Sequence, residues 1–265
     1  MQLSKPPRVL AIAGSDSSGG AGIQADIKTI TMLGGYAMTA ITAVTAQNTL
    51  GVQAVEVLSP SMVAAQIDAC FSDIGVDAIK IGMLGSPEIA HAVIDSILQA
   101  PPIPIVFDPV MVATSGSTLA DDRTIAAFKR LLQHANVITP NLSELEALTG
   151  MPAQTDDEIL AAASRLVEMT GAQVLAKGGH GRADEIIDLL IGPDGYPHRY
   201  AHPRIDTVHT HGTGCTLSSA IALFMAEKQG VEHSVRRAEQ FVRAALLAAP
   251  GFGAGHGPMG HQAVR

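Results

Sequence analysis

The stretch that decides the fold is residues 9–33, VLAIAGSDSSGGAGIQADIKTITML. Val9 to Ala13 is a short apolar run, which is typical of a strand that is buried on both faces. It leads into a loop rich in glycine and serine at 14–20, and residues 21–33 then place isoleucines at helical spacing. A buried strand, a flexible loop and an amphipathic helix in that order predict the repeating unit of an α/β fold.

The same alternation continues along the chain. Pro193-Asp194-Gly195 is a turn signal between two apolar stretches, so a hairpin is expected there. The order predicts an α/β chain in three layers: a doubly wound, mostly parallel central sheet between helices, with an antiparallel hairpin near the C-terminal third. Without a repeat or a linker, residues 1–265 are expected to form one domain. Further strands are expected at 38–46, 52–58, 78–81, 103–107, 137–138, 174–176, 185–191 and 200–208, and helices at 60–71, 87–98, 121–132, 141–148, 156–169, 215–228 and 233–248.

Composition argues against several classes of protein. Apolar residues make up 47% of the chain, charged residues 16% and aromatic residues 3%, which suits a sheet buried between helices. The net charge of −8 and the lack of a basic run disfavour a nucleic acid or an anionic membrane as partner. Cys70 and Cys215 match neither a disulfide framework nor a metal-binding spacing. No signal peptide or membrane-length apolar run is evident, so the cytoplasm is the expected location.

Polar and glycine-rich segments follow most of the expected strands. In a doubly wound sheet, ligands bind beyond the carboxyl ends of the strands. The coincidence predicts an active site at that edge of the sheet. The segments follow Ala13, Ala46, Ile81, Phe107, Ile138, Ala176 and Val208.

The segment 211–216, HGTGCT, carries the most chemistry. Gly212 and Gly214 allow backbone N–H groups to converge where a helix begins, and the helix start adds partial positive charge. This arrangement predicts an anion site suited to phosphate, and we expect the same field to lower the pKa of the Cys215 thiol. A glycine-rich turn that caps a helix, with Cys215 as a small buried residue, is the alternative. His209 and His211 near Cys215 are also compatible with a Cys/His hydrolase or acyltransferase, although no group that would orient an imidazole is evident.

Other strand-end residues favour a heterocycle and a phosphate as ligands. The Gln47 amide offers both a donor and an acceptor, which suits the edge of an aminopyrimidine. Asp108 and Glu144 could organise Mg²⁺ through water, although Asn141 and Glu144 also match a helix-capping pair. Lys177 is a point charge beside a flexible turn and could meet a phosphate. For each of these, a solvated or capping role stays open.

Two common nucleotide-binding motifs are missing. The loop 14–22 is not Gly-x-Gly-x-x-Gly, and Gln47 stands where a dinucleotide site would need an acid. No Gly-x-x-x-x-Gly-Lys-[Ser/Thr] occurs anywhere in the chain. If the protein handles ATP, it is therefore not a P-loop enzyme.

Taken together, these segments closely resemble the hydroxymethylpyrimidine/phosphomethylpyrimidine kinase family of thiamin biosynthesis, within the ribokinase-like superfamily. Each segment alone is a weak signal, but eight in order over essentially the whole chain are specific. They are AGSDSSGGAGIQAD at 13–26, TAQNT at 45–49, KIGML at 80–84, DPVM at 108–111, TPNLSE at 139–144, KGGH at 177–180, HGTGCTLS at 211–218 and GHGP at 255–258.

The resemblance implies a ribokinase-like fold and a chemistry. ATP, with Mg²⁺, would phosphorylate the hydroxymethyl group of 4-amino-5-hydroxymethyl-2-methylpyrimidine and then the resulting monophosphate, and the enzyme would be a homodimer. Cys215 would be the candidate base in an anion hole formed by Gly212, Thr213 and Gly214. The implied contacts are Gly14, Asp26, Gln47, Met83 and Val110 to the pyrimidine, Asn141, Lys177 and Thr213 to the nucleotide, and Asp108 and Glu144 to the metal through water.

Two alternatives remain, and residue 47 discriminates the first. Pyridoxal kinase, of the same superfamily, acts on another nitrogen heterocycle with a hydroxymethyl group, and Gln47 and Met83 favour the pyrimidine. A pyrimidine sensor without catalysis is the second, although it would not need the phosphate chemistry. The segment 112–119 could be a mobile flap over the pyrimidine or a static loop.

Overall fold

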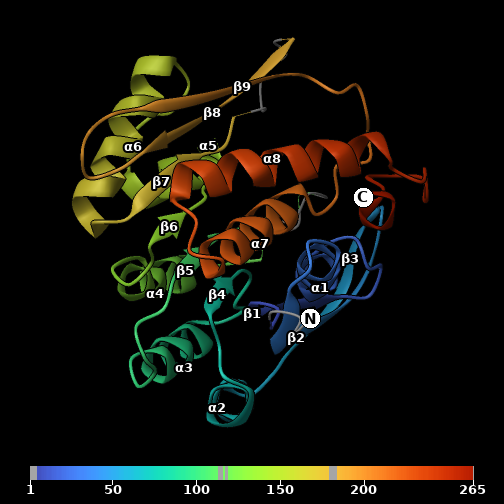
Figure 1. Ribbon diagram of the computed structural model, residues 1–265, viewed down its shortest axis with the longest axis vertical. Helices are drawn as coiled ribbons and strands as arrows, with labels where there is room; N and C mark the ends of the chain where they lie inside the picture. The colour runs from blue at the N-terminus through green and yellow to red at the C-terminus, as the bar shows by residue number, and fades with distance from the viewer. Residues whose placement is uncertain (1–4, 113–115, 117–118, 179–183, 265) are drawn as a thin grey trace.

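A computed structural model describes residues 5–112, 116, 119–178 and 184–264. It has three layers, with one nine-stranded sheet between two layers of helices (Figure 1). The sheet order is β3-β2-β1-β4-β5-β6-β7-β8-β9. The strands are β1 Arg8–Asp16, β2 Tyr36–Asn48, β3 Gly51–Val57, β4 Ala78–Ile81, β5 Ile105–Phe107, β6 Val137–Ile138, β7 Gln173–Ala176, β8 Glu185–Ile191 and β9 His198–Pro203. The α-helices are α1 Gly22–Met32, α2 Pro60–Ala69, α3 Pro87–Ile97, α4 Asp122–Leu132, α5 Leu142–Thr149, α6 Asp156–Thr170, α7 Thr213–Ala226 and α8 Val231–Leu247.

The two faces of the sheet have separate cores. Helices α2 to α6 cover one face, and α1, α7 and α8 cover the other. Along β1, Leu10 packs into the first core and Val9 into the second, because successive side chains of a strand point to opposite faces. This double burial is the reason that the central strands are continuously apolar, and it confirms the α/β prediction.

The parallel centre of the sheet and the hairpin β8–β9 are confirmed, but a second antiparallel hairpin, β2–β3, was missed, and β8 also pairs antiparallel with β7. Strands β2, β1, β4, β5, β6 and β7 run parallel, whereas β3 pairs antiparallel with β2 at the opposite edge. Only Thr49 and Leu50 separate β2 from β3. A link of that length permits a hairpin and not a parallel crossover.

Several boundaries differ from the expectation for identifiable reasons. Helix α7 begins at Thr213, two residues before the expected start, because Gly212 adopts φ of +85° and serves as its N-cap. A Cβ at Gly212 would collide with the carbonyl oxygen of Gly20, so glycine is required there. Strand β9 ends at Pro203 rather than at 208, since proline cannot donate to the ladder. After α2, the chain continues as a π-helical turn, Cys70–Ile74.

The C-terminal segment packs beside the end of β2 and the start of α7. Pro258 forms a β-bridge with His211, and the N–H of His256 donates to the carbonyl of Thr49 at 3.0 Å. A short 3-10 helix, His261–Ala263, follows. In the described part of the chain, no helix is both long and apolar enough to cross a membrane.

Candidate active site

A cavity of about 860 Å³ lies at the carboxyl ends of the parallel strands. The strand-end segments that the sequence singled out meet around it, as expected for a doubly wound sheet. Of the thirteen predicted site residues, twelve line this cavity: Gly14, Gln47, Met83, Asp108, Val110, Asn141, Glu144, Lys177, Gly212, Thr213, Gly214 and Cys215. Val112 and Leu119 line it too, while most of the proposed flap between them, and Gly179 and His180 of the KGGH segment, lie outside the described residues.

The start of α7 is where the sequence predicts an anion site. The N–H of Thr213 reaches the carbonyl of Thr210 at 3.3 Å, and that of Thr216 reaches Gly212 at 2.9 Å. Among the described residues, no protein acceptor takes the N–H groups of Gly214 and Cys215. Two donors at the positive end of a helix therefore face the cavity, where they can bind a phosphate or a developing negative charge.

The thiol of Cys215 does not have the lowered pKa that the helix start suggested. Burial raises its pKa to about 11, and the carboxylates of Asp26 and Asp108 add to that rise. Lys80 and the backbone N–H of Gly22 oppose it without cancelling it. Desolvation outweighs the helix field, so Cys215 is a protonated thiol in the resting cavity at neutral pH.

The expected contact of Asp26 with substrate is corrected by the structure. Asp26 and Lys80 are both fully buried, and the Lys80 Nζ lies 2.9 and 3.0 Å from the two carboxylate oxygens of Asp26. Ser219 Oγ donates to Asp26 at 2.7 Å. Asp26 is thus taken up by a buried ion pair beneath the anion site and does not line the cavity. A lysine in the middle of an apolar strand was the sequence signal for this pair.

Lys177 and Asp108 form a second ion pair, in the wall of the cavity. Lys177 Nζ lies 2.8 Å from Asp108 Oδ1, which also accepts from Thr139 Oγ1 at 3.1 Å. Burial lowers the pKa of Lys177, but Asp108 and Glu144 outweigh it, and the net pKa is raised. The ammonium stays charged. It lies against Gly214, whose Cβ, if it had one, would be 3.2 Å from Nζ.

Glu144 has the capping role that the sequence offered and also lines the cavity, while its metal role stays a prediction. Asn141 and Glu144 form a capping box at the start of α5, with both hydrogen bonds at 2.8 Å. Burial raises the pKa of Glu144 to about 7, with Asp108 adding to the rise and Lys177 opposing it. A buried carboxyl that titrates near neutrality, beside a second carboxylate, is a site where a cation would be stabilising.

Asp108 and Glu144 fit the Mg²⁺ that the resemblance to the kinase family implies. No three His, Cys, Asp or Glu side chains of the described residues converge as a metal site. Asp108 and Glu144 supply two carboxylates, and Mg²⁺ in phosphoryl-transfer sites commonly takes one or two carboxylates and completes its shell with water and phosphate. The donor set suits an ion that arrives with a nucleotide.

Sequence reasoning missed a polar network around Gln47 in the cavity wall. Asp16, Thr45 and His211 line it beside Gln47. Burial raises the pKa of Asp16, but hydrogen bonds from His211, Ser18 and Ala21 outweigh this and bring the pKa to about 2. The residues were visible in the sequence, but only the fold brings positions 16 and 211 together.

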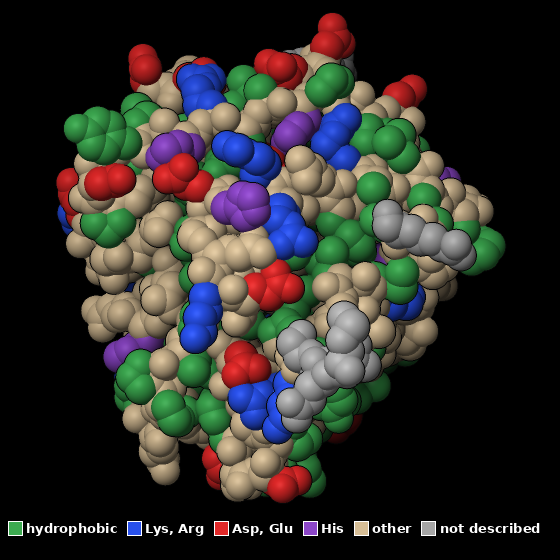
Figure 2. Space-filling model, in the orientation of Figure 1, with side chains coloured by type: hydrophobic (Ala, Val, Ile, Leu, Met, Phe, Trp, Pro, Cys, Tyr) green, Lys and Arg blue, Asp and Glu red, His purple; other side chains and the backbone are tan. Residues whose placement is uncertain are grey.

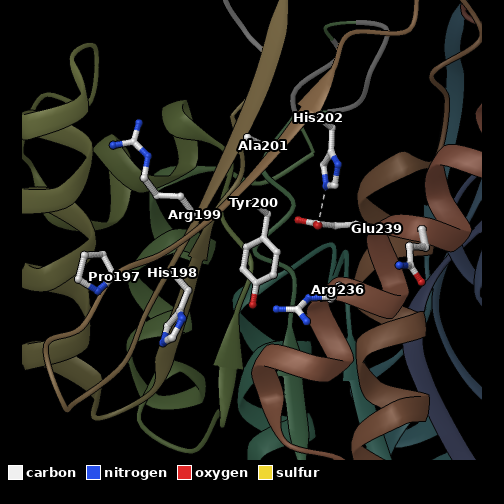
Figure 3. A pocket seen from close by; sticks show the side chains of 9 residues that line it. Pro197, His198, Arg199, Tyr200, Ala201, His202, Arg236 and Glu239 are labelled. Atoms are coloured by element: carbon white, nitrogen blue, oxygen red, sulfur yellow. Dashed lines mark hydrogen bonds and ion pairs between the residues drawn. The ribbon is translucent and has the colours of Figure 1, made fainter.

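A second missed cluster lies where β8 and β9 meet α8 (Figure 3). His202 Nε2 lies 2.7 Å from Glu239 Oε2, and both side chains line the cavity and also a surface pocket of about 460 Å³. Burial raises the pKa of Glu239 to about 8, and Asp188 adds to the rise. Asp188 accepts from the N–H of Gly178 at 2.7 Å and so anchors the residue after Lys177.

The face drawn in Figure 2 does not have the character of a polyanion-binding surface. Lys and Arg side chains are interspersed there with Asp and Glu rather than gathered in one basic patch. This mixture agrees with the net charge of −8.

Comparison with known proteins identifies the family. The model of a family described as phosphomethylpyrimidine kinase matches residues 16–260. The chain is 42% identical to the hydroxymethylpyrimidine/phosphomethylpyrimidine kinase of Haemophilus influenzae, over 98% of each protein. It is 44% identical to the thiamine biosynthesis bifunctional protein ThiED of Geobacter sulfurreducens, over 96% of this chain and 52% of that protein, so it spans about half of that relative.

A solved structure of a related kinase has the same fold. The pyridoxal kinase from Staphylococcus aureus in complex with AMP-PCP and pyridoxal superposes with a TM-score of 0.90 and 31% identity, over 98% of this chain and 95% of that one. The resemblance drawn from eight short segments is confirmed over the length of the chain. The protein belongs to the phosphomethylpyrimidine kinase family.

Proposed function

We propose that this enzyme transfers the γ-phosphoryl group of ATP to the hydroxymethyl group of 4-amino-5-hydroxymethyl-2-methylpyrimidine, and then phosphorylates the monophosphate to the pyrophosphate, in the synthesis of thiamin diphosphate. The observation that carries the proposal is that the Gln47 amide and the N-terminus of α7 face one cavity. The amide offers donor and acceptor atoms to a pyrimidine edge, and the helix start offers N–H groups to a phosphate.

ATP is expected to occupy the other end of the cavity. Lys177, Asn141 and Thr213 are our candidates for its phosphates. Part of the cavity wall is apolar, which suits a purine base. The apolar residues there are Ile205, Leu217, Val242 and Leu246. The match to a kinase solved with AMP-PCP supports this assignment.

The chemistry needs positioning and charge neutralisation more than a strong base. Phosphoryl transfer passes through a loose transition state with charge spread over the phosphoryl oxygens. The N–H groups of Gly214 and Cys215 and the Lys177 ammonium would stabilise that charge. When bound through Asp108 and Glu144, Mg²⁺ would neutralise further phosphate charge. With a pKa of about 11, the Cys215 thiol is suited to orient the substrate hydroxyl rather than to remove its proton early.

A pyridoxal kinase is the second candidate, and the similarity to the Staphylococcus aureus enzyme favours it. Both substrates are nitrogen heterocycles that carry a hydroxymethyl group, so the phosphate chemistry does not separate them. Gln47 favours the pyrimidine. We expect Gln47→Met to weaken use of the pyrimidine more than use of pyridoxal, and equal losses would count against this assignment.

Coupled ATP turnover with product masses tests the proposal. The enzyme is assayed with the aminopyrimidine alcohol, with its monophosphate and with pyridoxal, each with and without Mg²⁺. Mono- and diphosphorylated pyrimidine, formed only with Mg²⁺, are the expected products. Pyridoxal phosphate as the only product would overturn the assignment of the pyrimidine as substrate. A folded protein that turns over no ATP would refute the kinase proposal and leave the hypothesis of a pyrimidine sensor.

A homodimer in the cytoplasm is also part of the proposal. Strand β3 is exposed along most of its length, so the β2–β3 hairpin stands at an uncovered edge of the sheet. Apolar side chains in it are exposed, which is typical of a surface that a second chain covers. They are Val44, Leu50, Val55 and Val57. Sedimentation of the wild type and of Val55→Lys tests it: a dimer that the lysine dissociates is expected, and a wild-type monomer would refute it.

A further inference from the structure

Asp16, His211 and Thr45 line the cavity around Gln47 and have no part in the chemistry proposed above. Asp16 Oδ2 lies 2.8 Å from His211 Nε2, which lies 3.5 Å from the nitrogen of the Gln47 amide group. The other end of that amide contacts Thr45 Oγ1 at 3.1 Å. Asp16 and His211 are buried, with 4% and 5% exposed. The amide we assign to the pyrimidine is therefore held on both sides by protein.

The carboxylate determines which nitrogen of His211 carries its proton. Asp16 also accepts from the N–H groups of Ser18, Gly20 and Ala21, at 2.8 to 3.1 Å. Hydrogen bonds of this kind keep the carboxyl ionised, with a pKa of about 2. An ionised carboxylate only accepts, so the Nε2 of His211 must be the donor in their contact.

The donor at Nε2 in turn determines how the Gln47 amide is turned. The one Nε2–H points to Asp16 at 2.8 Å, so toward the Gln47 amide it makes only a longer, shared contact at 3.5 Å. That N–H attracts an amide oxygen and repels an NH₂ group, which favours the carbonyl oxygen on the His211 side. Thr45 supports the same orientation. Its single hydroxyl proton is used toward the carbonyl of Ser15 at 3.0 Å, which leaves its lone pairs to accept from the amide NH₂. Because amide oxygen and nitrogen have the same shape, the surrounding hydrogen bonds decide between them.

We infer that His211 is a positioning residue that, clamped by Asp16, fixes the orientation of the Gln47 amide and thereby determines which heterocycle edge the cavity accepts. The fixed amide presents one free N–H and one free oxygen lone pair. The complementary edge has a ring nitrogen that accepts beside an exocyclic amine that donates, as in a 4-aminopyrimidine. The identity of this ligand rests on the proposed function.

The same imidazole ties ring recognition to the anion site. Gly20 packs against the Cδ2 edge of the His211 ring so closely that a Cβ would collide with it. The backbone N–H of His211 donates to the carbonyl of Gly257 at 3.1 Å. The next residue, Gly212, is the N-cap of α7, where the proposed phosphate site begins. His211 thus joins the loop after β1, the end of β2 and the start of α7. Its loss should affect binding of the ring more than binding of ATP.

Kinetics of His211 variants test the inference. His211→Phe keeps an aromatic ring against Gly20 but removes the N–H, and we expect KM for the aminopyrimidine alcohol to rise about 10- to 100-fold. KM for ATP should stay within about twofold. His211→Gln, which retains an N–H donor, should recover part of the loss. His209→Phe is the matched control, since His209 packs on Gly257 in the same turn and does not line the cavity. An unchanged pyrimidine KM in His211→Phe, or an equal rise in both KM values, would overturn the inference.

Two further measurements keep the result interpretable if His211→Phe does not fold. Thr45→Val should raise the same KM, and Thr45→Ser should not, because serine keeps the hydroxyl. Imidazole ¹⁵N NMR of the wild type should show His211 as the neutral or doubly protonated form with its proton at Nε2. A ring protonated only at Nδ1 would refute the positioning role without any substrate. If the wild type phosphorylates only pyridoxal, the proposed function fails while the NMR result still decides the role of His211.

Discussion

At the residue scale, the site depends on atoms that are small or absent. Gly212 allows the turn that begins α7, and Gly214 leaves room for the Lys177 ammonium. Cys215 lines the cavity at the start of the same helix, and in the proposed reaction it would meet the substrate hydroxyl. Its raised pKa follows from burial, so at this scale the environment, and not the residue type, sets the chemistry.

Loss of the thiol is expected to affect turnover and not folding. Cys215→Ala should lower kcat about 100- to 1,000-fold, the usual cost of removing one group that stabilises or orients in the transition state. Cys215→Ser should retain more activity, because its hydroxyl can still hydrogen-bond. Steady-state kinetics with thermal unfolding as the folding control measures this. Wild-type kcat in Cys215→Ala would contradict the assigned role.

A single added methyl group at position 214 should disturb nucleotide binding. The Cβ of Gly214→Ala would lie 3.2 Å from Lys177 Nζ and 3.4 Å from Asp108 Oδ2, tighter than ordinary contacts. We expect kcat/KM for ATP to fall about 10- to 100-fold as the ion pair shifts. Gly230→Ala is the control, since a Cβ at the N-cap of α8 meets nothing within 4 Å. If Gly214→Ala and Gly230→Ala had equal kinetics, the Lys177–Asp108 ion pair would be able to shift without loss of activity, and the prediction would be wrong.

At the element scale, the ends of strands and helices bring the charges together. The capping box of α5 holds Glu144 beside the Lys177–Asp108 pair, so one carboxyl both caps the start of a helix and faces the cavity. On β2, an irregularity in pairing with β3 between Ala46 and Gln47 interrupts the alternation just before the ligand-facing amide. Element ends are where the chain can place polar groups without breaking a ladder.

Titration of Glu144 should give the pH profile of kcat/KM an acid limb, that is, a decline at low pH. Burial raises the pKa of Glu144 to about 7, so it is ionised above that pH and neutral below it. Because kcat/KM reports the free enzyme, kcat/KM for MgATP should decline as pH falls through about 7. Glu144→Gln should be less active and should lose this limb. If the limb persists in that variant, Glu144 is not the group that titrates.

At the scale of the whole molecule, the two cores leave polar groups buried where β8 and β9 pack on α8. Glu239 is 4% exposed, and within the part of the chain that the structure describes its Oε1 has no hydrogen-bond partner. The described residues of this region accommodate it as a protonated acid beside His202 (Figure 3). A group that folds in its neutral form links stability to pH.

Stability should therefore fall as the solution becomes alkaline. The pKa of Glu239 is raised from 4.5 in the unfolded chain to about 8 in the folded protein. Between these values the folded state holds a proton that the unfolded chain releases, so the stabilisation is complete below pH 4.5 and is lost as pH rises to about 8. Melting temperatures from pH 5 to 9 should decline, and less steeply in Glu239→Gln. Glu232→Gln, an exposed change on the same helix, should follow the wild type, and identical slopes in all three would refute the assignment.

The sequence by itself determined the layers, the parallel centre, the hairpin β8–β9 and the edge of the sheet that carries the site. Those features follow from local signals: apolar runs, helical spacing, and the glycine and polar residues at strand ends. It also sufficed to name twelve of the residues that line the cavity, because strand ends converge in any doubly wound sheet, but it missed others such as Asp16 and Thr45.

Only the tertiary structure decided how those residues behave. Asp26 is paired with Lys80, the Cys215 thiol is protonated, and Glu239 is neutral, all because of burial. Asp16 holds His211 although 195 positions separate them in the chain. Desolvation and contacts between distant segments depend on what packs around a group in three dimensions, and no local pattern in the sequence records that.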